Sequence, residues 1–253
     1  MDVGTQVSLA DITAARERIK GYIHHTPVMR CSYLDSIVGL QLHFKCENFQ
    51  KTGSFKMRGA TNAVKRLCET CGDGVAGKPA VVTHSSGNHA QALALAAHLC
   101  GVEAHIVMPD NCSAVKVQAV KDYGGLVTLC QSTEQARKDT AQQILSRLGP
   151  HAILVSSAEH DDVIAGQGTV AMEFLEQVPD LDAMVCSVSI GGLAAGICIA
   201  AKALKPSIRL IGSEPKNADD CARSLAAGRI IPNASPPVTI ADSLRHVSIE
   251  RLP

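Results

Sequence analysis

The stretch AVVTHSSGNHAQALALAAHL, residues 80–99, decides the fold of this chain. Its first four residues are apolar or β-branched and predict a buried strand. A polar loop with a glycine follows, and the alanine- and leucine-rich residues 90–99 predict a helix. The same alternation continues along the chain, with strands expected at 104–108, 126–129, 152–155, 184–186 and 208–211, and helices at 113–123, 133–148, 168–178 and 193–204. Apolar strands that alternate with helices indicate an α/β protein with a parallel sheet covered on both faces.

Length and composition restrict the class of protein and its partners. With 253 residues, 46% of them hydrophobic, the chain is long enough for one large domain or two small ones. Its 24 basic residues balance 24 acidic ones, so we expect no nucleic-acid partner and no membrane-binding patch. An aromatic content of 3%, without tryptophan, provides no stacking platform for bases. A small-molecule partner is therefore favoured.

Three features bear on the compartment. Residues 1–20 lack the basic and apolar segments of a signal peptide, and the ten cysteines are scattered along the chain. The close pair Cys68 and Cys71 has no second pair with which to bind a metal, and its flanks are typical of a helix end. The longest uncharged stretch, 183–201, is better explained as strand, loop and helix than as a membrane span. We predict a cytoplasmic protein.

The first candidate for chemistry is the segment KTGSFKMRGA, residues 51–60. In one interpretation Ser54 caps a helix and Lys56 lies on its solvated face, as most lysines do. In the other, Lys56 is a partly desolvated amine. Burial or a neighbouring cation lowers the pKa of such an amine and makes it able to condense with a carbonyl group. The residues alone leave both interpretations open.

Two further candidates are loops between a strand and a helix, where ligands of parallel sheets bind. The loop Thr83–His89 contains two serines, an asparagine and a glycine. It is either a turn with an N-cap or a cradle of N–H groups for a carboxylate or oxyanion. The glycines of the loop Ser187–Leu193 either turn the chain or let backbone amides approach a phosphate.

The fourth candidate is the acidic segment Glu214–Asp220, after the strand expected at 208–211. Two carboxylates with free carbonyls between them suit a hard cation that prefers oxygen ligands. The alternative is a solvated acidic turn. The sequence has no P-loop, no H-E-x-x-H and no G-x-S-x-G motif, which disfavours nucleotide hydrolysis, zinc peptidase and α/β-hydrolase chemistry.

Together these segments resemble the fold-type II pyridoxal-phosphate enzymes, and within them the serine/threonine dehydratase family. Gly53–Ala60 resembles the lysine motif of that family, and Ser85–His89 resembles its substrate-carboxylate loop. Further segments match in the same order, namely Thr26–Pro27, Phe44–Glu47, Gln50–Lys51, Val163–Thr169, Ala203–Ser207 and Glu214–Cys221. The resemblance implies two three-layer open sheets. It places a smaller domain at 80–152 and a larger, incomplete cofactor domain at 1–79 and 153–253.

The resemblance also implies roles for individual residues. Lys56 would bind pyridoxal phosphate covalently and then act as a base on one face of the substrate Cα, while Ser86 would exchange a proton on the other face. The implied reaction is racemisation of serine, in competition with β-elimination to pyruvate and ammonia. The cofactor would contact Phe55, Lys56, Asn88, Ser189, Ile190, Gly191 and Gly192, and the substrate would contact Ser85, Ser86, Gly87, Asn88 and His89.

Three expectations concern other ligands and partners. Glu214, the carbonyl of Ala218 and Asp220 would hold Mg²⁺ or Ca²⁺. Positions similar to those that bind a nucleotide effector, ATP, between subunits are Lys51, Thr52, Gln91 and Tyr123. The resemblance thus implies a homodimer.

Two departures from the family pattern matter. Relatives have four consecutive glycines where this chain has Ser189-Ile190-Gly191-Gly192, and a β-branched Ile190 at positive φ would be strained, which predicts weaker cofactor binding. Relatives also continue well past the position of Pro253, so we expect a C-terminally truncated chain. Two alternatives stay open: a dehydratase without racemase activity, and an inactive or regulatory chain that binds a full-length relative.

Overall fold

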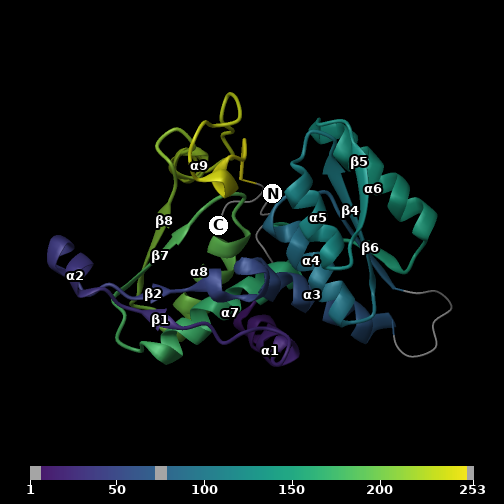
Figure 1. Cartoon of the computed structure of the whole chain (residues 1–253). Coiled ribbons are helices and arrows are strands. Elements are labelled where there is room, and N and C mark those ends of the chain that lie inside the picture. Colours follow the sequence, from purple (N-terminus) through teal and green to yellow (C-terminus); the bar gives the residue numbers. More distant parts are fainter. Residues whose placement is uncertain (1–6, 72–78, 250–253) are drawn as a thin grey trace.

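The computed structural model describes residues 7–71 and 79–249. Figure 1 shows two groups of elements side by side, one around β3 to β6 and the other around β7 and β8, with α3 between them. The elements are α1 (Leu9–Ile19), β1 (Val28–Met29), α2 (Ser32–Val38), β2 (Phe44–Lys45), η1 (Glu47–Phe49), η2 (Lys51–Gly53), α3 (Lys56–Cys71), β3 (Ala80–Thr83), α4 (Asn88–Leu99), β4 (Glu103–Pro109), α5 (Ala114–Asp122), β5 (Leu126–Cys130), α6 (Glu134–Leu148), β6 (Ala152–Leu154), α7 (Asp161–Gln177), β7 (Ala183–Ser187), α8 (Gly192–Leu204), β8 (Arg209–Ser213), α9 (Asp220–Ala227) and η3 (Asp242–Leu244).

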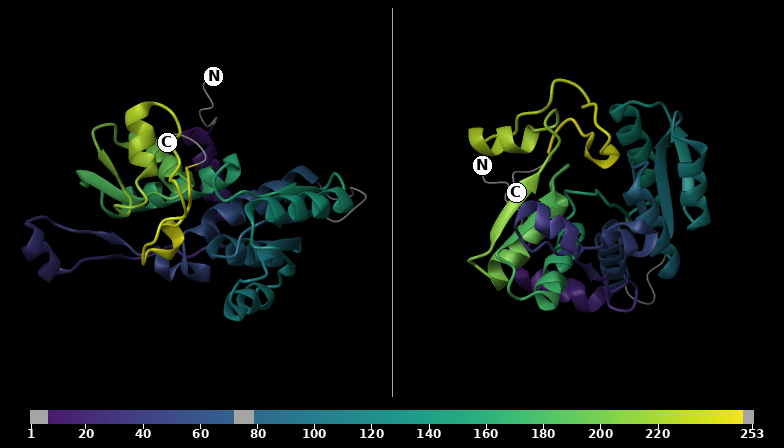
Figure 2. Two further views of the ribbon diagram at one scale, coloured as in Figure 1. Left: turned by 90° about the horizontal axis from the view of Figure 1, so that it is seen from above. Right: turned by 60° about the vertical axis from the view of Figure 1, so that its left-hand side comes forward.

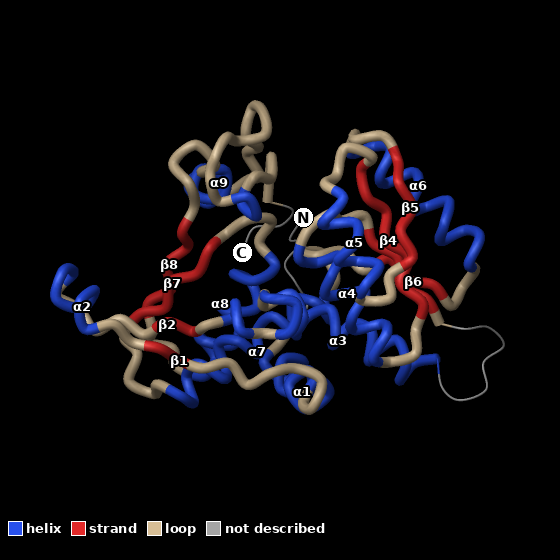
Figure 3. The backbone as a smooth tube through the Cα atoms, viewed as in Figure 1, coloured by secondary structure: helices blue, strands red, loops and turns tan. Residues whose placement is uncertain are grey.

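The larger sheet has four parallel strands in the order β5-β4-β3-β6 (Figure 3). Alternate residues of its central strands face opposite layers, as the pleat requires. Val81 and Ile106 pack against α3 and α4, whereas Val82 and Val107 pack against α6. The predicted α/β fold with a parallel sheet covered on both faces is therefore confirmed.

Helix α3 shares a core with this sheet, although it precedes β3 in the chain. Met57, Ala63 and Val64 are fully buried in the same cluster as Val81 and Leu93 of α4. The described sheet and its helices thus draw on residues before 79 as well as on 80–152. The division of the chain into two domains stays a prediction.

Two smaller sheets lie on the other side of α3. Strands β7 and β8 are parallel and form a pair, and β1 and β2 form an antiparallel pair. One face of β7 packs through Met184 onto a second core, which is built from α1, α7 and α8. The other face carries Val185, which is 63% exposed, opposite Ile211 of β8.

The helix predicted at 168–178 begins earlier than expected. Helix α7 starts at Asp161, and the prediction was wrong because it treated Gly166 and Gly168 as a break. Both glycines instead allow neighbouring helices to approach. A Cβ on Gly166 would lie 2.6 Å from the Cα of Gly59 in α3, and one on Gly168 would lie 2.9 Å from the carbonyl oxygen of Gly196 in α8.

The segment after α9 crosses from the side of β7 and β8 toward α5 (Figure 2). Its contact with α5 is an ion pair between Lys116 Nζ and Asp242 Oδ2 at 3.2 Å. The uncharged stretch 183–201 forms β7, a loop and α8, as predicted. No helix within the described ranges is long and apolar enough to cross a membrane.

Candidate active site

Lys56 is the first residue of α3 and is half-buried. Its Nζ donates a hydrogen bond to the carbonyl oxygen of Ser157 at 3.4 Å and lies 5.2 Å from the centre of the Phe55 ring. Ser54 does not cap the helix, because its buried Oγ has no hydrogen-bond partner among the described residues. The structure therefore favours the interpretation of Lys56 as a partly desolvated amine over that of a solvated lysine.

The start of α8 lies against the same carbonyl group. A Cβ on Gly192 would come within 3.1 Å of the Ser157 oxygen, so only glycine allows this approach. Gly191 precedes the helix with φ of 104° and provides no side-chain cap. A 13-residue helix with free N–H groups at its start is suited to bind an anion. The amine of Lys56 and this helix start are thus both neighbours of Ser157.

The strain expected at Ile190 is absent. Thr52 is the single non-glycine residue with positive φ among residues 7–71 and 79–249, so the prediction for Ile190 was wrong. Gly191 takes the left-handed conformation that the turn requires. Ser189 donates its hydroxyl to the carbonyl oxygen of Ser243 at 2.9 Å, which ties this loop to η3.

The loop Thr83–His89 leads from β3 into α4. Gly87 occupies the N-cap position without a side-chain hydrogen bond, and Ser85 Oγ accepts a bond from Gly87 N at 3.4 Å. Ser86 is half-buried. The free N–H groups of the first turn are arranged as an anion cradle requires.

His89 is almost fully buried, and its hydrogen bond fixes its tautomer. Nε2 lies 3.0 Å from the carbonyl oxygen of Val155, which can only accept, so Nε2 carries the proton. Nδ1 is then a bare acceptor, and it has no partner among the described residues. Burial, with a smaller contribution from the charge of Lys56, lowers the pKa of His89 to about 3. Its side chain therefore cannot donate to a substrate carboxylate, although its backbone N–H can.

A groove of about 490 Å³ borders this site. It runs between residues 41–45 and β7 and is largely apolar in its lining. Phe55, Ser187 and Leu193 belong to its wall. The groove therefore reaches the ring over which the Lys56 amine lies, from the side opposite α4.

The acidic segment makes hydrogen bonds to backbone N–H groups. Glu214 accepts bonds from Cys221 N and Ala222 N at 3.1 and 3.0 Å, and burial raises its pKa. Asp220 accepts bonds from Asn233 Nδ2 and Ile249 N at 2.9 and 2.8 Å. No group of three or more His, Cys, Asp or Glu side chains in the described part of the chain is arranged to hold a metal. The cation stays a prediction that rests on two carboxylates and the Ala218 carbonyl.

The residues expected to bind a nucleotide come from three neighbouring elements. Lys51 and Thr52 lie in η2, which packs against α4, and α4 packs against α5. Gln91 lies in α4, and Tyr123 ends α5. Thr52 Oγ1 is buried without a partner among the described residues.

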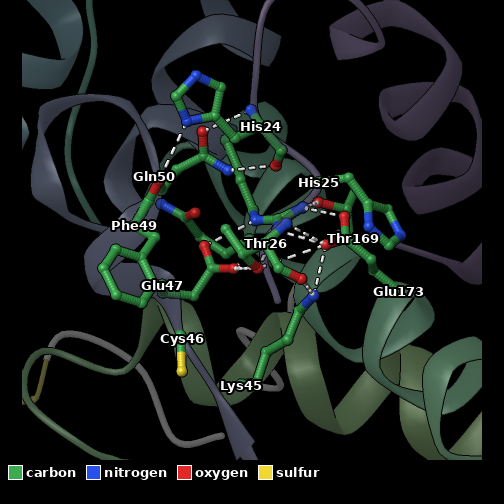
Figure 4. A network of polar contacts seen from close by, with 12 residues as sticks. His24, His25, Thr26, Lys45, Cys46, Glu47, Phe49, Gln50, Thr169 and Glu173 are labelled. Atoms are coloured by element: carbon green, nitrogen blue, oxygen red, sulfur yellow. Dashed lines mark hydrogen bonds and ion pairs between the residues drawn. The ribbon is translucent and has the colours of Figure 1, made fainter. Parts of the chain in front are cut away.

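Sequence reasoning missed a buried polar network just behind Lys56 (Figure 4). Arg58 is fully buried and pairs with Glu47 of η1 and Glu173 of α7. Lys45 also pairs with Glu173, at 2.5 Å. Burial alone would raise the pKa of Glu173, but the hydrogen bonds and charges of Arg58 and Lys45 lower it to about 2. The presence of Arg58 within the lysine motif was the available signal.

Comparison with known proteins identifies the family. A family model described as "Pyridoxal-phosphate dependent enzyme" matches residues 19–252. The chain belongs to this family. It is 47% identical to serine racemase of Homo sapiens over 240 residues, which cover 94% of the chain and 69% of the relative.

Solved structures of relatives support the same family. A structure of maize serine racemase superposes with a TM-score of 0.91 at 45% identity, covering 97% of this chain and 72% of that one. A bacterial-type comparison is given by threonine deaminase from T.th., which superposes with a TM-score of 0.88 at 39% identity, covering 97% of this chain and 78% of that one. The predictions of the pyridoxal-phosphate family and its fold are confirmed.

The residues present fit the cofactor of this family. Lys56 provides an amine, and the start of α8 provides N–H groups for a phosphate beside a glycine that a Cβ would obstruct. Two buried polar atoms without partners among the described residues, Ser54 Oγ and His89 Nδ1, flank this region in sequence and in space, since the Lys56 charge acts on His89. Buried polar atoms without partners in a native protein call for an explanation, and a bound polar group supplies one.

Proposed function

We propose that this chain racemises serine with pyridoxal phosphate and, in a competing reaction, eliminates the β-hydroxyl to give pyruvate and ammonia. One observation carries the proposal: the Lys56 amine and the uncapped start of α8 share Ser157 as a neighbour. An aldehyde with a phosphate tail needs these two groups close together. The high identity to proteins named serine racemase supports the choice of substrate.

When bound, pyridoxal phosphate withdraws electrons from the Cα of an amino acid and so acidifies its proton. In this proposal Lys56 provides the attachment and later removes or returns the Cα proton from one side. Ser86 would hold the proton of the other side. N–H groups at the start of α4 would orient the carboxylate, and those at the start of α8 would hold the phosphate.

His89 has a restricted part in this scheme. Because Nε2–H is held by Val155, its Nδ1 would accept a hydrogen bond from an N–H or O–H group of the bound molecules. Phe55 would limit the movement of the Lys56 side chain, since the amine lies over its ring.

The proposal includes further ligands and a partner. Mg²⁺ or Ca²⁺ would bind Glu214, the Ala218 carbonyl and Asp220, and ATP would bind Lys51, Thr52, Gln91 and Tyr123 between the subunits of a homodimer. The Thr52 hydroxyl, buried without a partner among the described residues, supports a ligand near η2. We also retain the division into a smaller domain, 80–152, and a cofactor domain formed by the remaining residues.

The decisive experiment is an absorption spectrum. Purified protein saturated with pyridoxal phosphate should be yellow, and borohydride should bleach the colour and leave a pyridoxyl group on Lys56. Lys56→Ala should abolish the colour, the adduct and the activity, because the variant lacks the amine that the cofactor needs. A wild-type protein without the adduct would refute the proposed function.

A second candidate is a dehydratase without racemase activity, which the similarity to threonine deaminase favours. Ser86→Ala separates the two functions. If Ser86 transfers the second proton, the variant should lose at least about a hundredfold of its racemisation rate and less of its elimination rate. Chiral chromatography of serine and a pyruvate assay would measure both rates. Equal losses would remove Ser86 from proton transfer, and wild-type protein that forms only pyruvate would support the dehydratase.

A further inference from the structure

The buried Arg58 closes a short loop that contains Lys56 (Figure 4). Its Nε and Nη2 donate to the two carboxylate oxygens of Glu47 at 2.8 and 2.7 Å, a bidentate geometry. Glu47 and Arg58 are 11 residues apart, and Lys56 lies between them. This pair therefore joins the two ends of the segment that presents the amine.

A second carboxylate anchors the closed loop to α7. Arg58 Nη1 donates to Glu173 Oε2 at 2.9 Å, and the backbone N–H of Thr26 donates to Glu173 Oε1 at 2.9 Å. Lys45 donates to the same oxygen. Two cations and two carboxylates balance one another, so the network is neutral although Arg58 is fully buried.

The loop itself is built to need such support. Gln50 is bonded to the backbone of His24 through both its Oε1 and its Nε2, at 2.8 and 2.7 Å. Thr52 has φ of 62°, a strained conformation for a β-branched residue, and strain of this kind persists only where surrounding contacts enforce it.

Helix geometry links Arg58 to the direction of Lys56. Positions two apart on an α-helix lie about 200° apart around its axis, so they point to nearly opposite sides. Arg58 points into the network with no exposed surface, which turns Lys56 toward Ser157 and the start of α8. Rotation or fraying of this first turn would move the amine away from both.

We propose that Arg58 is a positioning residue for Lys56, and that the Glu47–Arg58–Glu173 contacts hold the amine at the distance and direction that the cofactor requires. The inference rests on the proposed function, because it assigns the network a task in that site.

The test uses Arg58→Met, Arg58→Lys and a matched control, Arg18→Met. Arg18 is also largely buried and also holds α3, through Asn62 at 2.7 Å and Glu69, but farther along the helix. In protein without cofactor, brief treatment with acetic anhydride followed by peptide mass spectrometry gives the acetylation rate of Lys56, with Lys65 as internal reference. Titration with pyridoxal phosphate then gives the affinity.

In Arg58→Met, Lys56 should be acetylated several times faster than in the wild type, and cofactor affinity should fall at least about tenfold, since small displacements of a reacting group are costly. Arg58→Lys should recover part of both, because lysine keeps the charge but cannot bind both carboxylates bidentately. Arg18→Met should leave the Lys56 rate and the affinity within about twofold of wild type.

Two outcomes would overturn the inference: a folded Arg58→Met protein with wild-type acetylation and affinity, or an Arg18→Met protein with the same changes. If Arg58→Met does not fold, Glu47→Gln replaces it, because it keeps the side-chain volume and the Glu173 pair, and the same two readouts apply. If the wild type does not bind the cofactor at all, the proposed function fails, and the acetylation rates still decide whether Arg58 positions Lys56.

Discussion

At the scale of single residues, the chemistry depends on groups kept in unusual states by their neighbours. His89 is 3% exposed, and its hydrogen bond to Val155 keeps it neutral with Nδ1 as acceptor. A positive charge on this ring would be buried near Lys56, which explains why its pKa is lowered to about 3. This neutrality has a measurable consequence for folding.

The unfolded chain takes up a proton at His89 near pH 6.5, whereas the folded protein resists it down to about pH 3. Stability is therefore full above pH 6.5 and falls as the pH drops toward 3. In His89→Gln this part of the loss disappears. Between pH 6.5 and 4.5 the free energy of unfolding should fall by about 2 kcal/mol less in the variant than in the wild type. Urea titrations at both pH values measure this, and parallel losses would show that His89 is not buried as a neutral group.

Residues in sequence motifs were predictable, and their environments were not. Lys56, Ser86 and the glycines of the α8 loop stand where short local patterns place them. The state of Ile190 was mispredicted because the turn places its positive φ at Gly191 instead. Arg58 lay in a quoted motif, but its partner Glu173 is 115 residues away, and no local pattern encodes a contact of that range.

At the scale of elements, close approach of helices explains both a failure of prediction and a source of stability. Local propensity treats glycine as a helix breaker, which is why residues 161–167 were not assigned to α7. In the structure, the backbones of α3, α7 and α8 meet at glycines. A contact between three helices cannot be read from any one of them.

Gly196→Ala tests this packing. In an exposed helix the change would stabilise the protein, because alanine is a better helix former by up to about 1 kcal/mol. Here the new Cβ would lie 2.5 Å from the carbonyl oxygen of Ile164 and 2.6 Å from the nitrogen of Gly168, both backbone atoms. We expect destabilisation by about 1–3 kcal/mol, measured by thermal or urea unfolding. Ala203→Val, at an exposed position of α8, should change stability by less than about 1 kcal/mol. A stabilised Gly196→Ala protein would contradict the packing.

At the scale of the whole molecule, the two sides of α3 differ in how well their sheets are covered. The four-stranded sheet has helices on both faces. In the described structure, the β7–β8 pair packs on helices through one face and exposes Val185 and Ile211, a cross-strand pair, on the other. Phe44, which shares the groove with Val185, is 41% exposed. Parallel strands with an exposed apolar face are unusual and favour association.

We therefore expect this chain to self-associate through the β7–β8 face as its concentration rises. Val185→Lys places a charge in the middle of that face and should suppress the association, while stability changes by less than about 1 kcal/mol because the side chain is mostly exposed. Light scattering against concentration measures the effect. Val115→Lys is the matched control: Val115 is 79% exposed on α5, outside the β7–β8 face, so this variant should associate as the wild type does. If both lysine variants associate like the wild type, another surface is responsible. If both suppress association equally, net charge rather than the β7–β8 face controls it.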